Sequence, residues 1–147
     1  MWAAYNGHAD VVGLLMELGA DIHTADNDGR APLYLAAWNG HADVVKMLVA
    51  GKADINQADN DGRTPLYGAA YNGYADVVKL LVAGKADINQ ARNDGRTPHH
   101  VAASWGKRDV VKVLLSHGAD KTKADNDGTT PLDVAANEEI KRMLQAA

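Results

Sequence analysis

Six histidines are the side chains of this chain best suited to chemistry, because an imidazole can bind a metal ion or transfer a proton near neutral pH. His99 and His100 are adjacent, and neighbours on a helix diverge too far to face one site. Zinc-binding H-x-x-x-H and H-E-x-x-H spacings and phosphate-binding glycine loops are absent, and there is no cysteine ligand. The sequence therefore predicts no enzyme, no metal site and no cofactor.

Three Asp-Asn-Asp triplets, at residues 26, 59 and 125, are similar to the start of a calcium-binding loop. Such a loop ends on a bidentate acid at its twelfth position. The corresponding residues here are Ala37, Ala70 and Ala136. A calcium site is therefore not predicted either.

The charge balance and the apolar runs exclude two classes of partner. Fifteen basic and 19 acidic residues give a formal net charge of −4, which argues against a general nucleic-acid binder. No apolar run approaches the ~20 residues of a membrane span, and the N-terminal sequence does not resemble a signal peptide. We expect a cytoplasmic protein with no nucleic-acid, membrane or small-molecule partner.

A 33-residue period organises nearly the whole chain. Gly29, Gly62, Gly95 and Gly128 are 33 residues apart, and prolines, Ala-Ala pairs and Val-Val pairs follow the same step. This register predicts one domain, a solenoid whose units bury their apolar faces against their neighbours. We divide residues 1–147 into a truncated first unit (1–25), three full repeats (26–58, 59–91 and 92–124) and a closing capping unit (125–147).

Local signals within the repeat 59–91 predict a turn, two helices and a loop. Thr64 suits a helix N-cap, and Pro65 suits the first helical position. Gly73 is expected to end this helix, and a second helix is predicted over 75–82. The first unit of the chain has no turn, cap or proline, so its first helix is either shortened or preceded by further residues.

Two lysines replace glycine at the ends of second helices. Lys52 and Lys85 stand where other units have Gly19 and Gly118, and the glycines Gly51 and Gly84 come one residue earlier. Because glycine favours the left-handed conformation that closes a helix, we expect these two helix ends to be shifted by one residue.

The period and its motifs resemble the ankyrin repeat. T-P-L-Y at 64–67 and T-P-H-H at 97–100 are similar to the T-P-L-H signature, and N-G-H-A-D-V-V-K-M-L-V at 39–49 matches the second half of the repeat. The resemblance covers essentially all 147 residues. It implies an all-α solenoid of helix pairs with projecting β-turns, which binds another protein in a concave groove and is not a catalyst.

Two repeats are more alike than the family pattern requires. Residues 51–63 and 84–96 differ at one position. The chain therefore looks most like a consensus-designed ankyrin repeat protein, an engineered binding module for one folded protein partner. The alternative origin is a natural protein with recently duplicated repeats. The alternative functions are a self-associating homodimer and a scaffold without a partner.

Several positions depart from the ankyrin pattern. Ala31 replaces the capping threonine of its repeat, and Arg92 replaces an acid that starts the turn in other repeats. His99 stands where the motif has leucine. Tyr34 and Tyr67 occupy the place of the motif histidine, which in the family forms hydrogen bonds between repeats.

The tryptophans and tyrosines gather within a quarter of the period. They are Trp2, Tyr5, Tyr34, Trp38, Tyr67, Tyr71, Tyr74 and Trp105. At about 100° per residue, leucine and alanine fill the inward arc of the first helix, and seven of the eight rings lie on the opposite arc. We predict that these rings form an exposed partner-binding stripe, although Tyr34 and Tyr67 could instead pack between repeats.

The predicted binding site has four further members. Gly68 lies in mid-helix where the neighbouring repeats have Leu35 and Val101, and we interpret the missing side chain as room for a partner. A tolerated accident of selection is the alternative. Leu35 is included because it occupies the same position one repeat earlier. Arg63 and Arg96 follow the turn glycines and are predicted to contact an acidic edge of the partner, with a solvated row as the alternative.

Overall fold

The computed structural model describes all residues 1–147, which form nine helices and no strand. The helices are α1 (Trp2–Asn6), α2 (Ala9–Glu17), α3 (Pro32–Trp38), α4 (Ala42–Ala50), α5 (Pro65–Asn72), α6 (Ala75–Ala83), α7 (Pro98–Ser104), α8 (Arg108–Ser116) and α9 (Glu138–Ala146). This composition of nine helices and no strand confirms the predicted all-α class. None of the helices is long and apolar enough to cross a bilayer.

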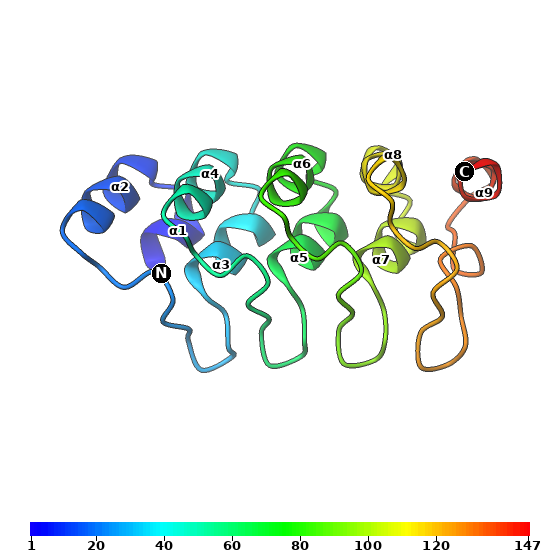
Figure 1. Ribbon diagram of the computed structural model, residues 1–147, viewed down its shortest axis with the longest axis horizontal. Helices are drawn as coiled ribbons and strands as arrows, with labels where there is room; N and C mark the ends of the chain where they lie inside the picture. Colours follow the sequence, from blue (N-terminus) through cyan, green and yellow to red (C-terminus); the bar gives the residue numbers. More distant parts are fainter.

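The helices stack in two rows (Figure 1). The first helices of the units, α1, α3, α5 and α7, pack on one another in one row, and the second helices, α2, α4, α6 and α8, pack in the other. The long loops that join one unit to the next all project on the same side, and α9 closes the end of the row of second helices. This arrangement is a solenoid in which each unit contacts only its neighbours.

The sequence signals for helix starts and stops act as predicted. The Thr64 hydroxyl accepts a hydrogen bond from the Tyr67 amide at 3.1 Å, which caps α5. Ala31 precedes α3 and offers no such bond. Gly73 closes α5 with φ 83°, in the left-handed conformation that glycine adopts without strain.

The core is aliphatic and runs continuously from unit to unit. Leu33, Leu66, Leu48 and Leu81 are almost fully buried, and the Ala-Ala pairs let the first helices approach closely. Ile140 and Leu144 of α9 close the core at the C-terminal end. Because α1, α3, α5 and α7 pack side by side over this core, their outer sides form one continuous face.

The Asp-Asn-Asp triplets form hydrogen-bonded turns. In the second full repeat, the Asp59 carboxylate accepts bonds from the amides of Asp61 (3.0 Å) and Arg63 (2.9 Å). The Asn60 amide donates to the Asp28 carbonyl of the preceding turn at 2.9 Å. The same bond recurs between each pair of successive turns, so each turn is hydrogen-bonded to the next.

The expected shift of two helix ends is wrong. α4 and α6 end in the same register as α2, and Lys52 and Lys85 themselves adopt the left-handed conformation, with φ 67° and 72°. The glycines that precede these lysines lie close to the preceding repeat, since a Cβ at Gly84 would lie 2.8 Å from the Ile55 Cδ1 and would displace that methyl group. The helix ends keep their register, and the two lysines carry the left-handed strain.

We expect Lys52→Gly and Lys85→Gly each to raise the free energy of unfolding by about 1 kcal/mol, since glycine removes the left-handed strain. Urea denaturation followed by circular dichroism measures the change. The matched control is Gly19→Lys, which places a lysine in the same conformation (φ 79°) and should destabilise the fold by a similar amount. A lysine-to-glycine change that lowers stability would contradict the interpretation.

Candidate binding face

Four rings form an aromatic ladder along the row of first helices. Tyr34 stacks on Trp38 with ring centroids 5.8 Å apart, and Trp38 stacks on Tyr71 at 5.3 Å and an interplanar angle of 14°. Trp105 meets Tyr71 edge-on at 5.4 Å. The ladder thus joins three successive repeats, because residues 38, 71 and 105 occupy nearly the same place in each.

The eight rings differ widely in exposure. Trp105 is 58% exposed, Trp2 and Tyr5 are also exposed, and Trp38, Tyr71 and Tyr74 are half-buried. Tyr34 and Tyr67 are each only 3% exposed, so for these two the packing alternative is correct. Burial raises the pKa of the Tyr34 hydroxyl far above its ordinary value. The exposed stripe is therefore narrower than predicted.

The predictions for Gly68 and Leu35 need correction. Both residues are buried, so neither offers surface to a partner. A Cβ at Gly68 would lie 3.0 Å from Cε3 of the Trp38 indole in the preceding repeat. The missing side chain makes room for Trp38, and not for a partner backbone.

The turn arginines are engaged by carboxylates of their own chain. Arg63 Nε donates to the Asp59 carboxylate at 2.8 Å, and its guanidinium lies over the Trp38 ring, 5.7 Å from the centroid. Arg96 Nε reaches Asp125 of the next unit at 3.3 Å. Arg63 therefore braces the ladder, and neither arginine is a free cation facing an acidic partner.

His99 and His100 are both buried, but only one has partners. His100 Nδ1 accepts from the Thr97 amide at 3.2 Å, and Nε2 therefore carries the proton and donates to the Thr129 carbonyl at 2.9 Å. Neither ring nitrogen of His99 has a hydrogen-bond partner. Burial, with a smaller contribution from His100, lowers the pKa of His99 to about 4.

Sequence reasoning missed one surface. Val11, Leu14, Leu15 and Leu18 of the first unit are exposed, although they stand in an apolar helix pattern. The signal that could have found them is the 33-residue register, in which Val44 and Leu48, the counterparts of Val11 and Leu15, are buried. No group of three or more histidines, aspartates or glutamates is placed to hold a metal ion.

One comparison with known proteins is informative. A family model described as ankyrin repeats in three copies matches residues 1–92 and again 69–146, which together span nearly the whole chain. No curated protein matches the sequence. The family match agrees with the paired helices of the structure.

Proposed function

Because the chain belongs to the ankyrin repeat family, whose members generally mediate protein–protein interactions, we propose that it binds one folded protein through the face that carries the aromatic ladder. The observation behind the proposal is the ladder itself, in which the half-buried Trp38 and Tyr71 and the exposed Trp105 form a contiguous row across three repeats, with the buried Tyr34 stacked on Trp38. Members of this family are typically not enzymes. Tyrosine and tryptophan are the residues enriched in interface hot spots.

The stacking contacts support binding by a rigid surface. Trp38 is held between Tyr34 and Tyr71, beneath Arg63 and against Gly68, so its ring has little freedom left to lose. A side chain already fixed in its bound position gives up less conformational entropy on association. The half-buried Trp38 and Tyr71 thus serve as a platform, and Trp105 adds exposed area at its C-terminal end. In the first unit, Tyr5, which has the register of Trp38, and Trp2 are exposed.

Trp105→Ala is the sharpest test of this face. The indole is largely exposed and touches the ladder only at an edge, so its loss removes contact area without opening the core. We expect the dissociation constant to rise by about 30-fold or more, which corresponds to about 2 kcal/mol. The melting temperature should change little.

The measurement needs a partner, which can be captured on the immobilised chain, identified by mass spectrometry and titrated by calorimetry. Lys112→Ala is the control, since this lysine is exposed on α8 in the other helix row. Unchanged affinity in Trp105→Ala, or an equal loss in Lys112→Ala, would place the interface elsewhere.

The origin of the chain is a separate question. The near-identity of residues 51–63 and 84–96 supports the copying of one unit, by design or by duplication. Lys52 and Lys85 in left-handed conformations favour duplication, because a designer would place glycine there. The unpartnered His99 in the core points the same way.

A further inference from the structure

The third full repeat differs from the rest of the chain in charge. Residues 92–124 contain seven lysines and arginines and three aspartates, a formal net charge of +4. The rest of the chain contains eight basic and 16 acidic side chains, a net charge of −8, and each of the two preceding full repeats stands at −1. A basic unit therefore lies between acidic units in a chain that is acidic as a whole.

Two cations of this repeat directly follow the exposed indole of the aromatic ladder. Lys107 and Arg108 come after Trp105, in the turn between α7 and α8, where the two preceding repeats have no lysine or arginine. The Lys107 side chain extends back to the preceding repeat, where its Nζ lies 3.6 Å from the place of a Cβ on Gly73. Its ammonium group therefore lies at the end of α5, two residues beyond Tyr71, while its backbone lies two residues beyond Trp105.

Lys107 has no acidic partner in its own chain. No carboxylate oxygen lies within 4.0 Å of its Nζ. Apart from the exposed Lys112 of α8, the other cations of the repeat either pair with carboxylates or donate to backbone carbonyl groups: Arg92, Arg96 and Arg108 in the first way, Lys121 and Lys123 in the second. Because Lys107 is half-buried, water reaches only part of it. A carboxylate from another molecule is the group that this ammonium lacks.

We propose that the bound partner presents an acidic segment at this end of the ladder, with a carboxylate on Lys107 and a neighbouring apolar side chain on Trp105. This partner chemistry rests on the proposed function, because it belongs to the same face. An ion pair partly removed from solvent is stronger than one on an open surface. The 58%-exposed indole supplies the apolar half of the contact.

A protein segment fits this surface better than a nucleic acid does. A nucleic acid is held by many phosphate contacts along a continuous basic surface. Here the units on both sides of the basic repeat are acidic and would repel a phosphate backbone. A short run of aspartate or glutamate, about one repeat wide, matches a single basic unit with acidic neighbours.

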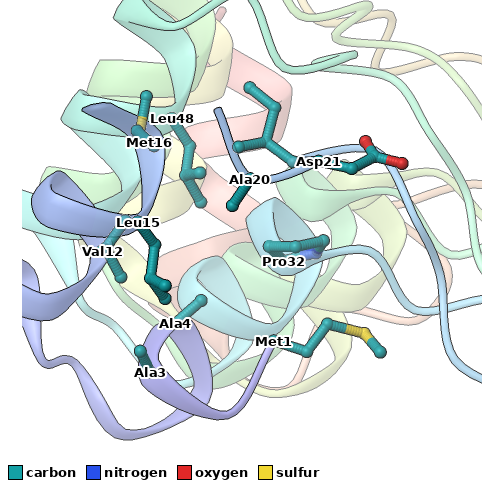
Figure 2. Close-up of a pocket in the computed structure, with 11 residues that line it drawn as sticks. Met1, Ala3, Ala4, Val12, Leu15, Met16, Ala20, Asp21, Pro32 and Leu48 are labelled. Atoms are coloured by element: carbon teal, nitrogen blue, oxygen red, sulfur yellow. The ribbon is translucent and has the colours of Figure 1, made fainter. Parts of the chain in front are cut away.

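A small acidic ligand does not fit either. The apolar hollow of the structure lies in the first unit, where Ala4, Val12 and Leu15 are among its lining residues (Figure 2). Its volume is about 50 Å³, whereas cavities for small ligands hold roughly 300–1,000 Å³. Neither Lys107 nor Trp105 lines it. On the surface where these two residues lie, a carboxylate gains little unless the molecule that carries it also covers the indole.

Charge reversal at Lys107 tests the proposal, in titrations with the protein captured on the immobilised chain. We expect Lys107→Glu to raise the dissociation constant at least about tenfold. Lys107→Met keeps an apolar chain against Gly73 and removes only the charge, so it should raise the constant about fivefold. Lys112→Glu is the matched control, because it makes the same charge change in the same repeat but in the other helix row. It should change the constant less than about twofold.

Carbodiimide cross-linking of the same complex detects the contact directly. The reagent joins a lysine amine to a carboxylate in contact with it as an amide, takes up the water that is lost and leaves as a urea. We expect mass spectrometry to find Lys107 joined to an aspartate or glutamate of the captured protein.

The outcomes separate this proposal from the proposed function. A dissociation constant that rises in Trp105→Ala but in neither Lys107 variant would overturn the acidic segment and leave the ladder as the binding face. Affinity unchanged in all three variants, or capture of no protein, would remove the proposed function as well. Equal losses in Lys107→Glu and Lys112→Glu, a complex without the Lys107 cross-link, or capture that nuclease treatment abolishes would each contradict an acidic segment on Lys107.

Discussion

Lowering the pH from about 7 to about 4 is expected to destabilise the fold by about 3 kcal/mol through a single side chain, His99. The folded chain holds the pKa of His99 at about 4, because the buried ring has no hydrogen-bond partner for a proton. In the unfolded chain the same ring titrates near 6.5. Between these two values the unfolded state binds a proton that the folded state does not, so stability falls as the pH falls.

Other acid-sensitive groups act at the acid end of this window. The pKa values of Asp26 and Asp125 are lowered from the ordinary aspartate value, chiefly by hydrogen bonds to Arg30 and to the Thr129 amide, respectively. Their contribution is present above about pH 5 and is lost progressively as the pH falls further. The slope between about pH 6.5 and about pH 5 therefore reports mainly on His99.

The measurement is urea denaturation at several pH values, with His99→Leu as the test variant. Leucine occupies this position in the two preceding repeats, as Leu33 and Leu66, so the variant should be more stable at pH 7, and its stability should change little between about pH 6.5 and about pH 5. His23→Leu, at an exposed histidine, should keep the slope of the parent chain. A slope that persists in His99→Leu would contradict the assignment.

The repeat frame could be predicted from the sequence because its signals are local. A threonine that caps a helix, a proline at its first position and a glycine after its last turn act within a few residues of one another. The observed bounds of α5, Pro65–Asn72, follow from Thr64, Pro65 and Gly73 alone. Repetition at 33 residues then fixes the rest, since each unit meets a neighbour of the same shape.

The burial of individual rings could not be predicted in the same way. A helical wheel divides one isolated helix into an inner and an outer arc, but in a solenoid the neighbouring unit covers part of the outer arc. Tyr34 and Tyr67 lie in that covered part, and Trp38 crosses it to lie against Gly68 of the next repeat. Such contacts depend on the offset between units, which no pattern within a single repeat encodes.

Removing the Asp59 carboxylate should lower the free energy of unfolding by about 3 kcal/mol. The side chain is fully buried and accepts three hydrogen bonds, from the amides of Asp61 and Arg63 and from Arg63 Nε. Asp59→Ala leaves both amides unpaired and deprives Arg63 of its buried partner. Because Arg63 lies over Trp38, the change should also alter tryptophan fluorescence in the native state.

The third repeat indicates why no carboxylate of the next unit can replace Asp59, which leaves Arg63 only Asp61, 2.9 Å from its Nη2. There Arg92 takes the place of the acid, and Arg96 pairs instead with Asp125 of the next unit. Arg63 cannot do the same, because the residue in that place of its next unit is Arg92, a like charge.

Asp26 is the matched control: it makes the same three contacts, but its side chain is 24% exposed. Water can satisfy the groups left behind there, so Asp26→Ala should cost about half as much as Asp59→Ala. Equal losses at the two sites would mean that burial does not set the strength of the turn. Unchanged tryptophan fluorescence in Asp59→Ala would mean that the ladder does not depend on the carboxylate that pairs with Arg63.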